Sequence, residues 1–304
     1  MRELPDHPTI LLFGASGQVG FELARSLAPL GRLELADRSR CDLRDKAAID
    51  ALVDQVQPHL IVNAAAYTAV DKAESESEIA FAINAQAPAH LAAAAARCGS
   101  RFIHYSTDYV FDGNKAGWYV EDDATAPQSV YGLSKLQGEQ AVAEAGCPHW
   151  IFRTSWVFGL HGGNFAKTML RLASERDALR VVADQFGAPT SAALIADVTA
   201  QAISRGWSRF APATAPDGIY HLCAGGETSW HGYAQALVER AAQRGATLRV
   251  NAAQVQPIPA SEYPVPAARP LNSRMDTTKL QATFGLSIPD WRDGVHRLVD
   301  QIYS

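Results

Sequence analysis

The sequence has little of what marks a secreted, metal-binding or membrane-spanning protein. Its four cysteines form no CxxC pair and no zinc-like pattern with the nine histidines. Residues 1–8 contain proline, aspartate and histidine and lack the apolar core of a signal peptide, and no run has the length of a membrane span. We therefore expect a cytoplasmic protein without a bound metal, whose cysteines are reduced: Cys41, Cys98, Cys147 and Cys223.

The sequence also lacks a strong excess of positive or negative charge. The chain has 27 Lys and Arg against 32 Asp and Glu, a net charge of -5, and nothing in this balance suggests a nucleic-acid or membrane partner. Internal repeats and low-complexity tails are absent. With 304 residues, 47% of them hydrophobic, the chain can form one large α/β domain or a nucleotide domain with a smaller lobe.

Short apolar runs alternate with helical periodicity through the first 160 residues. At least five such βα units predict a Rossmann-type α/β fold, a doubly wound parallel sheet. The expected strands are residues 9–13, 33–36, 60–63, 101–106 and 150–157, and the expected helices are residues 21–30, 46–55, 79–98 and 132–145.

The rhythm changes after Gly159. We expect helices at residues 164–175 and 192–204, the second returning to the sheet, and a loop that five prolines crowd between residues 257 and 270. This pattern predicts an NAD(P)-binding domain of residues 1–160 plus about 190–220. A smaller C-terminal substrate-binding lobe would then comprise about 161–189 and 221–304.

The glycine loop directly follows the first strand. Gly14, Gly17 and Gly20 provide a tight turn, close approach of the backbone to a pyrophosphate, and packing of helix on strand. Gln18 and Val19 open the helix, whose first amides would face the negative charge. The GxxGxxG spacing resembles that of the extended short-chain dehydrogenases/reductases.

The adenosine end of the cofactor is predicted to lie at the next strand. Asp37 follows the loop by about 20 residues, where a carboxylate accepts hydrogen bonds from a ribose. Arg38 and Arg40 could instead hold a 2'-phosphate, so both NAD and NADP stay open. Other residues expected along the cofactor are Asp42, Leu43, Ala65, Ala66 and Tyr67.

A tyrosine and a lysine four residues apart carry the predicted chemistry. Tyr131 and Lys135 would lie on one helix face, and a carbonyl that accepts a hydride also needs a proton. A free tyrosine with a pKa of about 10 holds its proton too tightly, and a neighbouring ammonium would lower that pKa. Thr107, at the end of a strand, can donate to the substrate carbonyl or to Tyr131, and Asp108 is a candidate substrate contact.

Long strings across nearly the whole chain resemble the dTDP-4-dehydrorhamnose reductase family. They are residues 62–74, 104–111, 152–157, 164–169, 184–190 and 269–273. The resemblance implies reduction of the C4 ketone of dTDP-4-dehydro-L-rhamnose to dTDP-L-rhamnose, the last step of that synthesis. It implies NADPH, with NADH possible, a dTDP-sugar substrate, and a triad of Thr107, Tyr131 and Lys135. Tyr105 is placed on the cofactor side, Trp156 against the deoxysugar, and Asn164, Gly187, Pro189 and Arg269 toward the nucleotide.

Oligomeric state stays open between monomer and homodimer. Some relatives are dimers bridged by Mg2+ through glutamates. This chain has Glu22, but Ala192 and Ala193 stand where a second glutamate is expected, which argues against a bridging Mg2+.

Three other functions remain as alternatives. A dehydratase of this type would carry an acidic pair, whereas Asp108 is followed by Tyr109. A nucleotide-sugar epimerase would retain its cofactor and oxidise no added NADPH. A non-catalytic regulatory subunit of the methionine adenosyltransferase type is the third, and the intact Thr107, Tyr131 and Lys135 set argues for catalysis over it.

Overall fold

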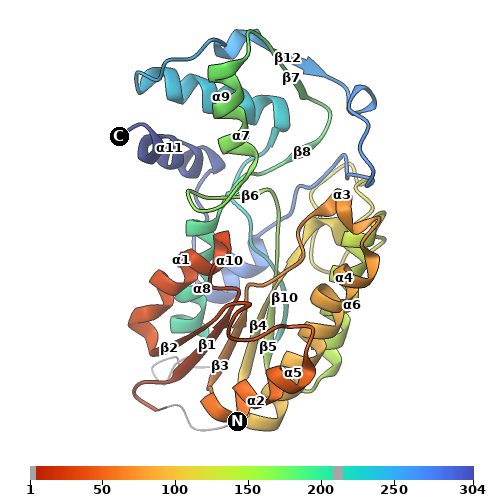
Figure 1. The fold of residues 1–304 in the computed structure, drawn as a ribbon, viewed down its shortest axis with the longest axis vertical. Coiled ribbons are helices and arrows are strands. Elements are labelled where there is room, and N and C mark those ends of the chain that lie inside the picture. The colour runs from red at the N-terminus through yellow and green to blue at the C-terminus, as the bar shows by residue number, and fades with distance from the viewer. Residues whose placement is uncertain (1–4, 208–214) are drawn as a thin grey trace.

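A six-stranded parallel sheet forms the base of the molecule (Figure 1). The computed structural model describes residues 5–207 and 215–304. The strand order is β2-β1-β3-β4-β5-β10. From β1 the chain first adds a strand on one side and then continues on the other, so the topological switch point, where a doubly wound sheet binds its ligand, lies between β1 and β3. The strands are β1 Thr9–Phe13, β2 Arg32–Ala36, β3 Leu60–Asn63, β4 Arg101–Thr107, β5 His149–Thr154 and β10 Gly218–His221.

Helices cover both faces of this sheet, so its central strands are apolar on both sides. One face packs against α1 (Gln18–Leu27), α8 (Ala192–Gly206) and α10 (Thr278–Phe284). The other face packs against α2 (Lys46–Val56), α5 (Ala87–Cys98) and α6 (Val130–Glu144). The predicted Rossmann-type architecture is confirmed.

Two predicted elements differ in their interior. The expected helix 79–98 is three joined segments: α4 (Ser77–Phe81), the π-helical η2 (Ala82–Gln86) and α5. By length and composition this run could cross a membrane, contrary to our expectation, but half of its most apolar window is buried inside the protein. The expected strand 150–157 ends at Thr154, because Trp156 adopts a left-handed φ of 48°.

A second hydrophobic core lies above the sheet, among α7 (Phe165–Glu175), α9 (Trp230–Gln243) and α11 (Trp291–Ile302). Short strand pairs join this lobe together. They are β6 Val157–Phe158 with β9 Thr190–Ser191, β7 Leu179–Val182 with β12 Val255–Ile258, and β8 Phe186–Gly187 with β11 Thr228–Ser229.

The boundary of the lobe differs from our expectation at α10. We assigned all of residues 221–304 to the lobe. Leu280 and Phe284 of α10 instead pack against the face of the sheet that α1 and α8 cover, and Phe284 contacts Trp150 and Tyr220. The chain therefore returns to the nucleotide-binding half before it enters α11. The remaining short elements are η1 Ala28–Leu30, α3 Val70–Ala73, η3 Asp108–Val110, η4 Ala252–Gln254 and η5 Ala260–Glu262.

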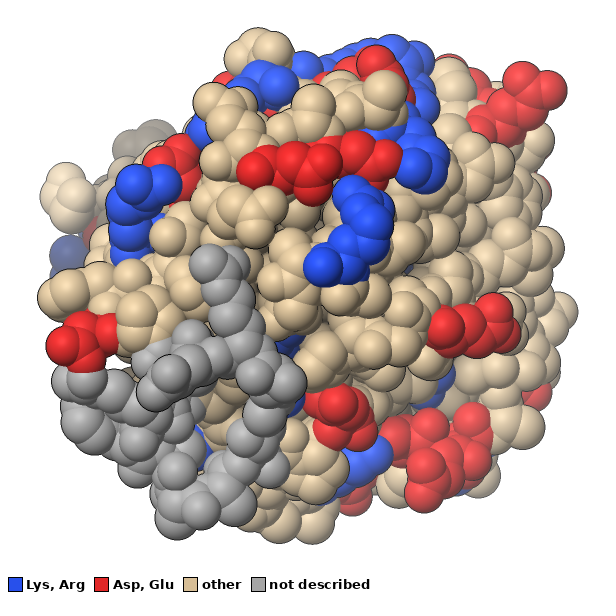
Figure 2. Space-filling view, turned by 90° about the horizontal axis from the view of Figure 1, so that it is seen from below, with Lys and Arg blue, Asp and Glu red and all other residues tan. Residues whose placement is uncertain are grey.

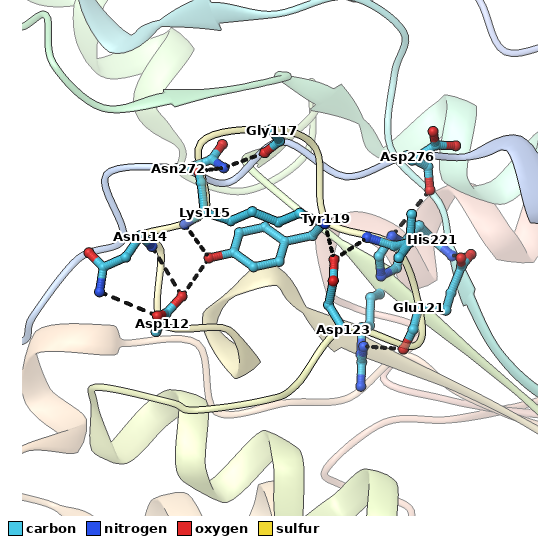
Figure 3. A network of polar contacts seen from close by, with 12 residues as sticks. Asp112, Asn114, Lys115, Gly117, Tyr119, Glu121, Asp123, His221, Asn272 and Asp276 are labelled. Atoms are coloured by element: carbon cyan, nitrogen blue, oxygen red, sulfur yellow. Dashed lines mark hydrogen bonds and ion pairs between the residues drawn. The ribbon is translucent and has the colours of Figure 1, made fainter.

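A polar network fixes the segment between η3 and α6 to the C-terminal part of the chain (Figure 3). The Tyr119 hydroxyl donates to Asp112 Oδ1 at 2.6 Å, and the ring stacks on Phe111 with centroids 4.2 Å apart. Asn272 Nδ2 donates to the carbonyls of Lys115, at 2.7 Å, and Gly117, at 2.8 Å. This network joins the segment that links Thr107 to Tyr131 to the segment that follows Arg269.

A buried ion pair ties α6 to β5. Arg153 donates to both carboxylate oxygens of Glu139, at 2.9 and 2.7 Å, and both side chains are almost fully buried.

On the outside, the face seen from below carries acidic and basic side chains interspersed among uncharged ones (Figure 2).

Candidate active site

A cavity of about 890 Å³ lies at the carboxyl ends of the central strands. Its walls come from both halves of the molecule: the glycine loop and the ends of β3 and β4 on one side, and residues after β5 together with α9 on the other. Most residues that the sequence singled out line it. Four of the cofactor and substrate candidates do not: Gly20, Arg40, Gly187 and Pro189.

The glycine loop is shaped by close packing. Gly14 has a φ of +77°, and a Cβ there would lie 2.5 Å from the amide nitrogen of Ala65. At Gly20 a Cβ would lie 2.0 Å from the carbonyl oxygen of Gly14. Gly20 therefore packs α1 against the loop, the packing role expected within the glycine loop, and it does not line the cavity. Gly17 precedes α1, with Gln18 and Val19 at the cavity wall.

The end of β2 is arranged around Asp37. Its Oδ1 accepts hydrogen bonds from Ser39 N at 2.9 Å, Ser39 Oγ at 2.6 Å and Arg40 N at 3.1 Å, and these bonds lower the pKa of the carboxyl. Arg40 turns away to Glu34 and to the carbonyl of Leu35. The cation left on the cavity wall beside Asp37 is thus Arg38, with Arg44 held by Asp42 further along, next to Leu43.

The strand end at Ala65, Ala66 and Tyr67 is held by a residue that sequence analysis missed. Asn84 Oδ1 accepts from the amide of Tyr67 at 2.8 Å, and Asn84 Nδ2 donates to the Tyr67 carbonyl at 3.0 Å and to Ser134 Oγ at 3.1 Å. Asn84 lies in the π-helical segment η2. Such a local widening of a helix is frequent at functional sites and leaves no clear sequence pattern.

The predicted acid and its lysine both line the cavity from α6, one turn apart. Lys135 is 2% exposed, and its Nζ donates to the carbonyl of Tyr105 at 2.6 Å. The Tyr105 phenol points away and shares a hydrogen bond of 2.8 Å with Thr199 in the core. Tyr105 lines the cavity and contributes its carbonyl to this site, while its hydroxyl is bonded in the core.

Burial dominates the proton affinities of the site. It raises the pKa of Tyr131 to about 12, although the Thr107 hydroxyl beside the phenol opposes the shift. It lowers the pKa of Lys135 to about 8, against the field of Glu139. Our expectation that Lys135 lowers the Tyr131 pKa is wrong for this arrangement, because the ammonium is directed at the Tyr105 carbonyl.

Thr107 and Asp108 end β4 beside the phenol. Thr107 Oγ1 donates to Asp108 Oδ1 at 3.0 Å and accepts from the amide of Tyr109 at 3.2 Å. Burial raises the pKa of Asp108 to about 6, against hydrogen bonds from Ser273 and Thr107. Near neutral pH the protonated form of this carboxyl is therefore much more populated than that of an exposed aspartate.

Two stacked indoles form part of the cavity wall. The rings of Trp156 and Trp230 are 3.7 Å apart and nearly parallel, at 14°. Gly187 lies behind the first, since a Cβ there would be 2.8 Å from its Cε2 atom. Gly187 therefore supports Trp156 and makes no wall of its own, and Pro189 is buried next to it in sequence. Trp230 was missed, because a tryptophan at the start of a distant helix gives no sequence signal of a stacking partner.

Two of the four residues assigned to the nucleotide end, Asn164 and Arg269, line the cavity, each with a partner. Asn164 Nδ2 donates to Gln18 Oε1 at 2.9 Å, and its Oδ1 accepts from the amide of Lys167 at the start of α7. Arg269 pairs with Asp71 at 2.9 Å, and its buried Nε has no hydrogen-bond partner among the described residues. Arg269 thus lines the cavity with one donor that is buried and unpartnered.

Comparison with known proteins matches the whole of this architecture. The family model described as "RmlD substrate binding domain" matches residues 8–304. A dTDP-4-dehydrorhamnose reductase of Burkholderia thailandensis is 50% identical over 97% of this chain and 99% of its own length. One from Escherichia coli is also 50% identical, over 97% and 98%.

The chain belongs to the dTDP-4-dehydrorhamnose reductase family.

Solved structures agree with this assignment. The dTDP-4-dehydrorhamnose reductase of Bacillus anthracis, in complex with NADP, superposes with a TM-score of 0.88 at 34% identity over 97% of this chain and 99% of that one. The UDP-glucose 4-epimerase of Thermus thermophilus, in complex with NAD, reaches 0.79 at 20% identity over 96% and 98%, which shows a shared fold alone.

The residues present fit a nicotinamide dinucleotide. The backbone turn at Gly14 leaves no room for a side chain, a Cβ at Gly17 would lie 3.4 Å from the carbonyl oxygen of Gly14, and the amides that begin α1 are directed along the helix axis toward the loop. No group of three or more His, Cys, Asp or Glu in the described ranges, 5–207 and 215–304, could hold a metal ion. Glu22 pairs with Arg25, and Ala192 is buried at the start of α8.

Proposed function

We propose that this protein reduces dTDP-4-dehydro-L-rhamnose to dTDP-L-rhamnose with NADPH, as the last step of dTDP-L-rhamnose synthesis. One observation carries the proposal: Thr107, Tyr131 and Lys135 line the same cavity as the glycine loop and the indole pair. The names of the relatives at 50% identity support the same substrate.

When bound along the glycine loop, NADPH would supply the hydride for the C4 carbon of the sugar. The protein supplies the proton. Tyr131 is the acid that protonates the C4 oxygen, and the Thr107 hydroxyl beside it orients that oxygen. Because burial raises the Tyr131 pKa to about 12, the phenol is fully protonated before reaction. The site is therefore prepared for reduction, in which the acid must hold its proton until charge develops.

The other polar groups would position the substrate. Trp156 and Trp230 both line the cavity, and their stacked indoles give an apolar surface for the C6 methyl group and the C–H edges of the ring. Arg269, through its unpartnered Nε, is suited to the diphosphate, because a guanidinium donates in a fixed planar fork. Asn164 holds the lobe to the glycine loop through Gln18.

NADPH is favoured over NADH by the arrangement after β2. The carboxylate of Asp37 already accepts three hydrogen bonds on one oxygen, and Arg38 remains on the cavity wall, where it can face a 2'-phosphate. NADH remains an acceptable second cofactor, since the other Asp37 oxygen can still accept from a ribose hydroxyl.

The decisive assay follows the loss of NADPH absorbance with the dTDP-4-keto sugar made by the preceding epimerase. Wild type consumes NADPH, and Tyr131→Phe loses about 10² to 10⁴ in kcat, the contribution of a positioned acid. Tyr263→Phe is the matched control, because that ring is 56% exposed and does not line the cavity. If wild type is inert but binds NADPH tightly, the epimerase or regulatory alternative replaces this proposal.

We also propose that the protein acts in the cytoplasm, as a monomer or homodimer that uses no metal bridge. The four cysteines are unpaired, which suits a reducing compartment. Sedimentation with and without EDTA tests the oligomeric part: a mass that falls on chelation contradicts it.

A further inference from the structure

A histidine that no part of the mechanism uses lies directly behind the catalytic lysine. His104 is fully buried on β4, with its Nε2 atom 3.3 Å from Lys135 Nζ and its Nδ1 atom 3.2 Å from Asn63 Nδ2. Asn63, at the end of β3, is fully buried as well. The three side chains form a line from the strand below the cofactor site to the lysine.

The orientation of the Asn63 amide is fixed from outside this line. Its Oδ1 accepts a hydrogen bond of 3.1 Å from the backbone amide of Ala65. A flipped amide would place two donors face to face, so the NH2 group points at His104. An NH2 group only donates in this setting, so it favours His104 Nδ1 as an acceptor, against a backbone contact with Asn63 that raises the His104 pKa.

This orientation decides where His104 carries its hydrogen. Burial, together with the charge of Lys135, lowers the pKa of His104 well below its usual value, so the ring is neutral and has one N–H. With Nδ1 accepting, the hydrogen is on Nε2. The ring therefore directs a donor at Lys135 Nζ.

That donor distinguishes the two states of Lys135. An ammonium has three donors and no lone pair, so it cannot accept from Nε2–H, whereas a neutral amine can. Both states can donate to the Tyr105 carbonyl. We propose that Asn63 and His104 are positioning residues that set the proton affinity of Lys135, holding it short of permanent protonation by presenting the Nε2–H tautomer to its Nζ.

Other charged groups around Lys135 act in the opposite sense or are neutralised. Glu139, one turn further along α6, favours the ammonium, but its carboxylate is engaged by Arg153 of β5. Tyr131, one turn back, is protonated and uncharged. His104 and the Tyr105 carbonyl are the two groups of β4 that contact Nζ. We call the contacts from Asn63 through His104 to Lys135 the relay. It adds to the effect of burial on the pKa of Lys135.

Only the effect of the relay on the reaction rate rests on the proposed reduction. The position of the His104 hydrogen can be tested without substrate. Two-bond 1H–15N correlation spectra of protein labelled on histidine nitrogen show which ring nitrogen carries the hydrogen. The His104 signals are assigned by their loss in His104→Leu. In wild type above pH 8, where Lys135 is a neutral amine, we expect the hydrogen on Nε2; a hydrogen on Nδ1, or on both, overturns the relay.

The second test is the pH dependence of kcat/KM for NADPH oxidation. Asn63→Asp keeps the acceptor for Ala65 but replaces the NH2 group with an acceptor, which moves the His104 hydrogen to Nδ1 and turns Nε2 into an acceptor for the ammonium. We expect the alkaline pKa of kcat/KM to rise by about one unit or more. His104→Leu alone, which removes the opposing donor, should also raise it.

The double variant separates the relay from the added negative charge. In the His104→Leu background, Asn63→Asp acts through its charge alone and should shift the alkaline pKa less than it does when His104 is present. Equal shifts in both backgrounds overturn the proposal. An inactive wild type would refute the reduction itself and leave the tautomer result standing, so the two failures are distinguishable.

Discussion

The placement of Gly187 behind the indole predicts that one methyl group there disturbs the substrate wall without touching the cavity. In Gly187→Ala, the new Cβ would lie 2.8 Å from Cε2 and 3.1 Å from Cζ2 of Trp156, and 3.2 Å from Cβ of Ser273. Carbon atoms pack best at about 3.5–4.0 Å, so the methyl group is roughly 1 Å too close. The indole cannot simply retreat, since Trp230 stacks against it at 3.7 Å.

The size of the effect follows from the overlap. Overpacking of this kind costs about 1–3 kcal/mol, either in folding or in displacement of the indole. If the indole moves, the loss appears in kcat/KM for the sugar, and 1–3 kcal/mol corresponds to roughly 5-fold to 150-fold. If the indole stays, the same free energy is lost from the stability of the folded state.

Two measurements on the same protein distinguish these outcomes: urea unfolding and steady-state kinetics with the dTDP-4-keto sugar. Gly117→Ala is the matched control, because its Cβ would have no neighbour within 4 Å, although this residue also adjoins Asn272. We expect the control to behave as wild type. A Gly187→Ala protein with unchanged stability and unchanged kcat/KM would refute the role assigned to Gly187.

Three further predictions concern charge. Asp108 has a folded pKa of about 6 against 3.8 in the unfolded chain, so the folded state binds the extra proton and loses up to about 3 kcal/mol as pH rises through that interval. Asp108→Asn should remove this slope in urea unfolding between pH 4 and 7, and an unchanged slope would contradict the assignment. Glu139→Gln leaves the buried Arg153 uncompensated and should destabilise the fold by about 3–5 kcal/mol, while Glu175→Gln on the surface should change stability little. Arg38→Ala should raise KM for NADPH more than KM for NADH, and equal effects on both would argue that Arg38 does not meet a 2'-phosphate.

Sequence patterns predicted the elements whose identity depends on local periodicity. The strand Thr9–Phe13, the glycine loop and the helix that carries Tyr131 and Lys135 follow from runs of apolar residues and from spacing along one chain segment. Most of the residues that the sequence singled out line one cavity, because the carboxyl ends of parallel strands meet at one edge of the sheet.

Features that depend on contacts between distant segments were not predictable. The stacking of Trp156 on Trp230 joins residues 74 positions apart in sequence (230 minus 156). The direction of the Lys135 ammonium depends on the Tyr105 carbonyl, and the i to i+4 spacing with Tyr131 says nothing of it. Gly187 carries the same lesson, since only the folded chain shows that it faces an indole and not the cavity.

The π-helical turn at Ala82–Gln86 has a consequence for how this enzyme could be engineered. Such a turn accommodates one more residue than a regular α-helix, and here it carries Asn84, whose side chain fastens both backbone groups of Tyr67. Deleting a single residue there would restore uninterrupted α-helical hydrogen bonding and favour the helix. It would also rotate Asn84 away by about 100°. A variant selected for more regular helices would therefore tend to lose the hydrogen bonds from Asn84 to Tyr67 that hold the segment after β3. This turn should be excluded from such selections.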